Sequence, residues 1–330
     1  MESKLNFQSL KEYSRKFAQI SCEGYFKDNL KINGREILKF STIHQINSLI
    51  LKKLFENWQL ESEKFNSPYF NYSSAQVQLT LKRFLNVLSN NIEIDQKHFQ
   101  LLVEEAVFDC LLLIFSPYDF YRNELINGFS NPHLTSGLNQ LVKYIQINRH
   151  LGEDLLTQLQ QHQNENPDLE IALKIFDKVV EDTADLPDEI DQHLSTFNEI
   201  CPLEEDSIYL ETKPSETENL SDQNDHHWEI GTLNDKLKSE SAPSLAEIHQ
   251  FKAIDNIENS LTVNQQFMFI NELFGGDEPQ FSKALKDLEN FDNYDAAISS
   301  LKESYGAANN WDFESEEVKE LFGLISKKYN

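Results

Sequence analysis

The chain has 330 residues, and a hydrophobic content of 39% with 23 Phe is enough to fill a core, which excludes a wholly disordered protein. Only 10 Gly and 9 Pro are present. Parallel α/β enzymes and β-barrels use glycine at tight turns and phosphate loops, so this composition argues against them and predicts helices joined by polar loops. The net charge of −26 is uneven, because residues 1–150 carry 17 basic and 15 acidic residues whereas residues 151–330 carry 12 and 40. Such a field repels nucleic acid and anionic membranes and attracts basic surfaces, unless the acidity serves solubility alone.

An amphipathic helix opens the chain, with an apolar stripe made by Leu10, Tyr13, Phe17 and Ile20. Residues 30–40 then form two short alternating runs around the Asn33-Gly34 pair. This pair favours a tight β-turn, so we expect one small β-hairpin there. The Ser-Thr pair at residues 41–42 starts a helix that ends near Trp58.

Ser73 or Ser74 starts the next helix, which has an apolar stripe made by Val77, Leu81, Phe84, Leu85 and Leu88. Asp95 caps a longer helix that ends at Ser116-Pro117. This helix is apolar on most faces, so we expect it at the centre of its domain.

A further helix starts near Leu138, and we expect it to continue with a kink near Gly152. These elements make residues 1–162 an N-terminal multi-helix domain. Residues 163–201 contain two more helical patterns, and the sequence leaves open whether this extension packs on the domain.

The stretch after residue 201 is strongly acidic and poor in large apolar side chains. Residues 202–243 hold 11 acidic residues and 3 basic ones. A segment of this kind cannot bury enough apolar area to offset the entropy of ordering, so we predict that residues 202–244 form a disordered acidic linker.

Residues 245–330 return to helical spacing. Four amphipathic stripes follow one another, centred near residues 268, 285, 299 and 322. Gly275-Gly276 ends the first of these helices and Asp277 caps the second. The predicted fold class is therefore all-α: an N-terminal multi-helix domain with one β-hairpin, the acidic linker, and a C-terminal four-helix bundle.

The sequence carries none of the common phosphate-loop, zinc-protease, dithiol or nucleophile-elbow motifs. Cys110 could act as a nucleophile with His98 or His133, but its apolar helix favours a buried structural thiol. A weak metal site is conceivable in the linker, although solvated side chains are the simpler interpretation of Asp222, Asp225, His226, His227 and Glu229. We therefore predict no catalytic residue, no cofactor and no metal site.

Two charged features of the N-terminal domain remain. Asp109 lies among apolar neighbours and needs a basic partner or a helix-end amide, and a structural ion pair is favoured over a catalytic acid. Lys52 and Lys53 form a short basic patch, which is weak support for nucleic-acid binding.

Three cysteines, Cys22, Cys110 and Cys201, are odd in number and widely spaced, which argues against a disulfide framework. The N-terminal sequence has no apolar run of signal-peptide length, and the most apolar stretch, from Ala106 to Phe115, is too short to cross a bilayer. We expect reduced thiols, a cytoplasmic location and no membrane segment.

Residues 267–277, FMFINELFGGD, resemble a segment of an uncharacterised family of acidic, helical bacterial proteins. The wider stretch through Tyr305 and the region from Ile32 to Phe70 are similar to the same family. The resemblance implies no activity, site or partner, since these relatives are hypothetical proteins.

The function that we expect is that of a non-enzymatic interaction or adaptor protein that binds a basic protein partner and no nucleic acid. The candidate partner-binding residues are Trp311 and Phe313, although both aromatic rings could simply close the small bundle. One alternative is an enzyme with a site in the N-terminal domain around its most buried helix. A second is an acidic mimic of nucleic acid, which would need its acidic residues on one ordered face.

Overall fold

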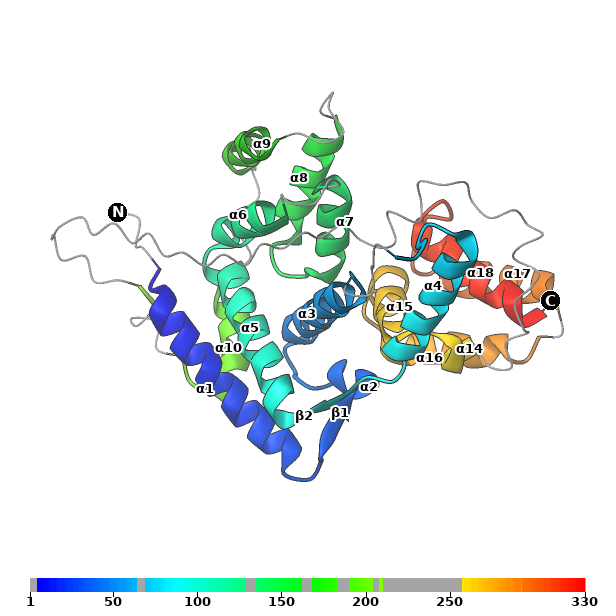
Figure 1. Ribbon diagram of the computed structural model, residues 1–330, viewed down its shortest axis with the longest axis horizontal. Helices are drawn as coiled ribbons and strands as arrows, with labels where there is room; N and C mark the ends of the chain where they lie inside the picture. Colours follow the sequence, from blue (N-terminus) through cyan, green and yellow to red (C-terminus); the bar gives the residue numbers. More distant parts are fainter. Residues whose placement is uncertain are drawn as a thin grey trace, which may run out of the picture. The chain divides into compact units, whose positions relative to one another are not determined.

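The protein is mostly helical in the computed structural model, which describes residues 5–63, 69–128, 134–161, 168–182, 190–203, 208–209, 257–291 and 293–329 (Figure 1). The predicted helical fold class is confirmed. The chain divides into two compact units. Residues 1–72 and 93–237 belong to the first unit, and residues 73–92 and 238–330 belong to the second.

In its described residues, the first unit consists of helices and two short strands. Their bounds are α1 Phe7–Phe26, β1 Lys31–Asn33, α2 Gly34–Ile37, α3 His44–Glu63, β2 Glu93–Asp95, α5 Gln96–Phe115, α6 Pro117–Gly128, α7 Leu134–Tyr144, α8 Arg149–Gln161, α9 Leu169–Asp182 and α10 Ile190–Ile200.

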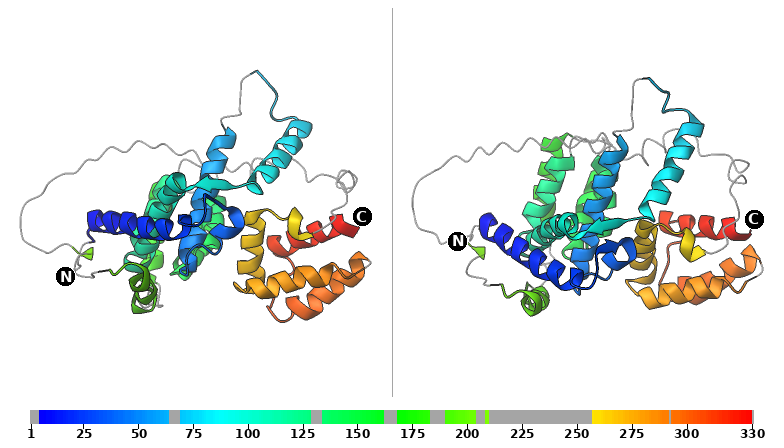
Figure 2. Two further views of the ribbon diagram at one scale, coloured as in Figure 1. Left: turned by 90° about the horizontal axis from the view of Figure 1, so that it is seen from below. Right: turned by 60° about the horizontal axis from the view of Figure 1, so that its bottom comes forward.

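Helix α5 is the centre of this unit, as its apolar sequence predicts. Half of its residues are buried, among them Phe99, Cys110 and Leu111, and the carboxylate of Asp95 caps it by accepting a hydrogen bond from the His98 N–H at 3.0 Å. Helices α1 and α3 both pack on α5, and α1 lies alongside it in each view (Figures 1 and 2).

The first unit contains a two-stranded β-sheet, but its strands pair differently from those of the predicted hairpin. Strand β1 pairs antiparallel with β2, so that Lys31 lies opposite Asp95. Asn33 is the N-cap of α2 and not a turn residue. Its side-chain oxygen accepts hydrogen bonds from the Arg35 and Glu36 N–H groups, and the Glu36 carboxylate accepts one from the Asn33 N–H. This capping box satisfies the first donors of the helix, so the hairpin prediction at Asn33-Gly34 is wrong.

The predicted kinked helix is two helices, α7 and α8. The break lies before Arg149, where Asn148 has a φ of 53° and donates its side-chain amide to the Leu113 carbonyl at 2.7 Å. Gly152 sits inside α8 without a kink. A Cβ there would lie 2.8 Å from the ring of Tyr121, so the glycine is required by close packing.

The extension packs on the N-terminal helices. Helix α9 contacts α6 and α8, and α10 contacts α1 and α5. The Tyr13 hydroxyl donates to the Cys201 carbonyl at 2.6 Å, and Leu5 forms an antiparallel bridge with Tyr209. The packed chain therefore reaches Tyr209, inside the predicted linker 202–244. Most of that linker lies outside the described residues.

The second unit contains the predicted C-terminal bundle, and its four helices are confirmed. The helices of this unit are α4 Ala75–Ser89, α14 Ile257–Ser260, α15 Val263–Met268, the π-helical segment η1 Phe269–Leu273, α16 Glu278–Leu288, α17 Tyr294–Leu301, the π-helical segment η2 Lys302–Gly306 and α18 Glu316–Tyr329. Helix α15 continues into η1 and α17 continues into η2. Thr262 caps α15 in a capping box with Gln265, and Asp277 caps α16 as predicted.

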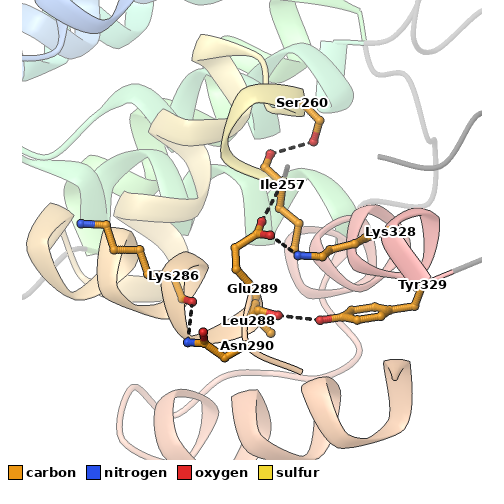
Figure 3. A network of polar contacts seen from close by, with 8 residues as sticks. All are labelled: Ile257, Ser260, Lys286, Leu288, Glu289, Asn290, Lys328 and Tyr329. Atoms are coloured by element: carbon orange, nitrogen blue, oxygen red, sulfur yellow. Dashed lines mark hydrogen bonds and ion pairs between the residues drawn. The ribbon is translucent and has the colours of Figure 1, made fainter. Parts of the chain in front are cut away.

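The bundle has a core of its own, built from α14 to α18. Its largest members include Phe269, Phe274, Phe281 and Trp311. Glu289, at the end of α16, joins three elements: its carboxylate accepts from the Ile257 N–H at 3.1 Å and pairs with Lys328 of α18 (Figure 3). The Lys328 side chain is only 13% exposed, so this pair is shielded from solvent and links the end of α16 to α18.

Candidate interaction surface

Trp311 lies in the core of the bundle, only 7% exposed. Its indole N–H donates to the Leu273 carbonyl at the end of η1, and its backbone N–H donates to the Gly306 carbonyl at 3.0 Å at the end of η2. The ring meets Phe274 edge-on at 5.4 Å between centroids. Trp311 therefore ties the two π-helical ends together and does not present its indole to a partner.

The two π-helical ends have local causes. After η1, Gly275 and Gly276 take φ values of 59° and 86°, and the Gly276 N–H donates back to the Ile270 carbonyl at 2.9 Å. After η2, Asn310 has a φ of 53° just before Trp311. A residue in the left-handed backbone region can end a helix, and Gly and Asn adopt that region at little energetic cost. π-Helical turns are rare and are often found at functional sites, which draws attention to this end of the bundle.

Phe313 is the exposed aromatic of this end, with 43% of its surface accessible. Its ring lies over Gly306, where an added Cβ would come within 3.2 Å of the ring carbon Cζ. The Lys302 ammonium lies 5.4 Å from the ring centroid, at a distance typical of a cation–π contact. The ring thus packs against Gly306 and Lys302 while 43% of the residue's surface faces solvent.

The neighbours of Phe313 in the chain are acidic. Asp312 and Glu314 flank it and are both exposed, and Asp312 accepts a hydrogen bond from the Glu314 N–H at 2.9 Å. Lys319 pairs with Glu314 at 2.8 Å, but both side chains are more than half exposed, so this pair is weak. We call Lys302, Asp312, Phe313 and Glu314 the Phe313 surface. Of the two predicted partner-binding residues, Phe313 is accessible and Trp311 is not; binding itself stays a prediction.

A second group of polar side chains lies inside the first unit, where α3, α5 and α6 meet. The Lys52 ammonium is 2.8 Å from a Glu56 oxygen and 2.9 Å from a Glu124 oxygen, and the Lys52 side chain is only 7% exposed. Next to it, Lys53 lies 2.8 Å from Asp109. The prediction that Asp109 needs a basic partner is confirmed. We call these five residues the ion-pair cluster.

Charge in the ion-pair cluster shifts several pKa values. Burial alone would lower the pKa of Lys52, but the carboxylates of Glu124 and Glu56 outweigh it and raise the pKa. Burial alone would raise the pKa of Glu124, but Lys52 and Lys53 outweigh it and hold the pKa below its ordinary value of 4.5. The cations and Glu124 therefore keep each other charged, which is typical of a structural ion pair.

The sequence placed Lys52 and Lys53 in a basic surface patch, and that interpretation is wrong. Two adjacent lysines can both turn inward here because long apolar stems reach past the helix surface to carboxylates on two neighbouring helices. Glu56 and Glu124 are the members that sequence reasoning missed. Glu56 follows Lys52 by four residues, the spacing of an ion pair on one helix face, and Glu124 lies between Tyr121 and Leu125, which are both buried.

Of the other candidate catalytic or metal-ligating residues, the structure describes only Cys110 and His98. Cys110 is fully buried, and burial raises the pKa of its thiol, so it is not an activated nucleophile. His98 lies on the exposed first turn of α5, where its Nδ1 is 2.8 Å from its own cap, Asp95. His133 and the linker group from Asp222 to Glu229 lie outside the described residues.

Within the part of the chain that the structure describes, no three His, Cys, Asp or Glu side chains are grouped as a metal ion would need. Among the described helices, none is long and apolar enough to cross a membrane.

Residues 258–330 match the model of a domain of unknown function, DUF8457. This match covers the C-terminal bundle, including the Phe313 surface. The resemblance to an uncharacterised family is therefore shown for these residues, whereas the region from Ile32 to Phe70 lies outside the match. No curated protein and no solved structure matches the chain.

Proposed function

We propose that the protein is a non-enzymatic adaptor whose C-terminal bundle binds a basic protein segment through the Phe313 surface. The observation that carries this proposal is the state of Phe313. It is 43% exposed beside a closed core, yet its ring packs against Gly306 and Lys302. An aromatic side chain that is already positioned loses little entropy on binding, which suits it to anchor an interface.

Charge supports a basic partner. Asp312 and Glu314 flank the ring, and residues 151–330 carry 40 acidic residues against 12 basic ones. Acidic groups around an apolar anchor select partners whose own anchor pocket is rimmed by Lys or Arg. In an adaptor, the first unit would bind a second partner, and the connecting chain would set the effective concentration.

The alternative, an enzyme with a site in the first unit, has the ion-pair cluster as its structural candidate. Catalysis there would require an amine or carboxylate with a pKa moved toward neutrality. The pKa of Lys52 is raised and that of Glu124 is lowered, so both move away from neutrality. These two shifts favour a structural role for the Lys52–Glu124 pair, whereas burial raises the pKa of the neighbouring Glu105. The exposed ring of Phe313 keeps the adaptor as the first proposal.

The test compares full-length wild-type chain with Phe313→Ala in quantitative affinity capture, followed by titration of the captured partner. Leu30→Ala is a matched control, because Leu30 is a large apolar side chain that is 93% exposed outside the bundle. We expect Phe313→Ala to weaken binding by about 2 kcal/mol, or roughly 30-fold, and Leu30→Ala to leave it unchanged. Equal affinities for the wild type and Phe313→Ala would overturn the assignment of the Phe313 surface.

A further inference from the structure

The Lys302 ammonium contacts two aromatic rings at once. It lies 5.4 Å from the centroid of the Phe313 ring and 5.3 Å from the centroid of the Phe322 ring. Both distances fall within the roughly 6 Å over which the face of a ring attracts a cation. Phe313 follows η2 and Phe322 lies on α18, so two separate segments of the bundle bring their rings to one cation. We call Phe313 and Phe322 the ring pair.

Packing that does not involve Lys302 supports both rings. The Phe313 ring lies over Gly306, where an added Cβ would come within 3.2 Å of the ring carbon Cζ. Phe322 is partly buried and packs against the core of the bundle. Lys302 itself is exposed. The ring pair is therefore a feature of the folded bundle that does not depend on the ammonium.

The backbone at Lys302 is unusual as well. Lys302 is the first residue of η2, and its carbonyl accepts from the Ala307 N–H at 2.9 Å, five residues along the chain. A π-helical turn of this kind holds one residue more than an α-helical turn. Such turns are rare and are often found at functional sites, and this one carries the side chain that meets the ring pair.

The rings hold the Lys302 ammonium only weakly. Within the described residues, its contacts are these two rings, and no carboxylate forms an ion pair with it. At an exposed site, one contact between a cation and a ring changes an equilibrium by a factor of about two to five. A ring face attracts an ammonium ion whichever chain carries it, so an incoming ammonium can replace that of Lys302.

Charges near the ring pair favour an incoming cation. Asp312 and Glu314 flank Phe313 and are exposed. Lys319 pairs with Glu314, whereas the Asp312 carboxylate forms no ion pair within the described part of the chain. Asp312 therefore remains available to attract a basic group that approaches the rings.

We propose that the ring pair binds a lysine side chain of the basic partner segment, and that Lys302 occupies this site in the free protein. The inference rests on the proposed function and deepens it, because it names the group that the bundle recognises. Lysine fits because the structure already places a lysine ammonium against both rings. On binding, the partner's ammonium takes the place of the Lys302 ammonium, which returns to water. Lys302 is thus an internal competitor that lowers the affinity for the partner.

Titration of a blocked Gly-Gly-Lys-Gly-Gly peptide with the full-length chain, followed by NMR of the peptide, tests the proposal. The matched peptide carries norleucine, which has the same straight chain without the ammonium. We expect the ε-methylene protons of the lysine peptide to move upfield, because protons over a ring face are shielded. The dissociation constant should be roughly millimolar, and the norleucine peptide should bind about fivefold more weakly.

Two variants separate competition from support. Lys302→Ala should bind the lysine peptide at least two- to fivefold more tightly, since the competitor is gone. Lys283→Ala is the matched control, because Lys283 is an exposed lysine on α16 of the same bundle, and it should behave as wild type. Phe322→Leu removes one ring but keeps an apolar side chain. Added to Lys302→Ala, it should weaken lysine binding by about two- to fivefold. Circular dichroism checks that each variant is folded.

Three results would overturn the proposal. Equal binding of the two peptides would mean that the rings recognise an apolar chain and not a cation. Unchanged or weaker binding in Lys302→Ala would mean that Lys302 supports the ring and does not compete. Unchanged binding on adding Phe322→Leu would exclude the second ring from the site.

Failure of this inference can be told from failure of the proposed function. If Phe313→Ala weakens the captured partner but the lysine peptide shows no preference over norleucine, the adaptor proposal stands and the lysine site does not. If the lysine peptide binds as expected but the captured partner is indifferent to Phe313→Ala, the lysine site stands and the adaptor proposal does not.

Discussion

At the scale of single residues, the polar side chains of the first unit act mainly through their partners. Lys52 is buried but has two carboxylates within 2.9 Å, and the side chain of Asp109, which is 14% exposed, has the Lys53 ammonium at 2.8 Å. A buried charge is tolerated when its partner compensates the lost hydration, so the contribution of such a pair appears only when one member is removed.

Lys52→Met should destabilise the protein, because it leaves Glu124 without its nearest cation. Removing one member of a buried pair costs about 3–5 kcal/mol, and the lower end is expected since Glu124 keeps 21% of its surface exposed. Urea unfolding measures the change. Lys174→Met is the matched control: Lys174 pairs with Glu170 at 2.6 Å, but both are at least 70% exposed, so its loss should cost less than about 1 kcal/mol. Equal losses in both variants would contradict a buried role for Lys52.

Glu124 should also contribute to acid denaturation. Its pKa is lower in the folded chain than its ordinary value of 4.5, so the folded state binds this proton less readily than the unfolded state does. Its contribution to stability is therefore present above about pH 4.5 and is lost as the pH falls through the lower folded pKa. Unfolding free energies of wild type and Glu124→Gln, measured from about pH 3 to pH 7, should differ in slope only in the acid range. Parallel profiles would mean that Glu124 titrates normally.

At the scale of elements, the sequence predicts helices well where a polar cap and an apolar stripe agree. Asp95 and Asp277 cap the helices expected of them, and α5 is central as its composition indicates. The hairpin failed because Asn33-Gly34 suits both a tight turn and a helix start, and Glu36 three residues later decides for the helix. The partner of β1 lies some 60 residues away, which no local pattern indicates.

The Phe313 surface could be predicted only in part. An aromatic pair near the start of the last helix was evident, but two alternating residues, Trp311 and Phe313, face core and solvent respectively. Trp311 faces the core because its two N–H groups donate to the Leu273 and Gly306 carbonyls, which lie at the ends of the two π-helical segments. The inward orientation of Lys52 and Lys53 was missed for a similar reason, because the carboxylates of Glu124 and Asp109 that pair with them lie on other helices.

Gly306→Ala tests the packing of this end. A Cβ would lie 3.2 Å from Phe313 Cζ and 3.4 Å from Trp311 Cε3, so the rings must shift. Gly323→Ala in α18 is the control, because nothing lies within 4 Å of its added Cβ, and it should stabilise the helix by about 0.5–1 kcal/mol. We expect Gly306→Ala to be less stable than Gly323→Ala by about 1–3 kcal/mol in thermal or urea unfolding. Equal stabilisation would show that Phe313 moves aside freely and is not held.

At the scale of the whole molecule, the two units differ in how far apart in the chain their contacting segments lie. The bundle from Ile257 to Tyr329 closes a core among its own helices, and Glu289 links the end of α16 to α18 (Figure 3). The first unit depends on contacts between distant segments, such as Leu5 with Tyr209. We therefore expect the bundle to fold as an isolated fragment more readily than the first unit does.

A fragment of residues 257–330 should fold alone. Its described core residues lie between Ile257 and Ile325, and its helices carry their own caps. The purified fragment should give a helical circular dichroism spectrum and a cooperative melt. As a comparison, residues 1–200 should fold less well than residues 1–209, because the shorter piece lacks the chain that bridges Leu5. A random-coil spectrum for 257–330 would mean that its apolar faces need the rest of the chain.

Partner binding by the adaptor should weaken as salt rises. Residues 151–330 carry an excess of 28 acidic residues while residues 1–150 carry a small basic excess, so attraction of a basic partner must come from the second half. This attraction is screened over about 8 Å at physiological salt. The association rate of a partner captured through the Phe313 surface should fall about tenfold or more from low to high salt, and the dissociation rate should change less. Surface plasmon resonance at several ionic strengths measures both.

The acidic segment 210–244 allows a matched comparison, because it holds eight acidic and three basic residues. Replacing those eight acidic residues by Asn or Gln keeps the length of the segment but removes its negative charge. The variant should lose part of the salt dependence of association, while the effect of Phe313→Ala on dissociation stays the same. Binding that is indifferent to salt in the wild type would mean that the acidity serves solubility alone. Recognition would then rest on the apolar contact of Phe313, and the partner would not need to be basic.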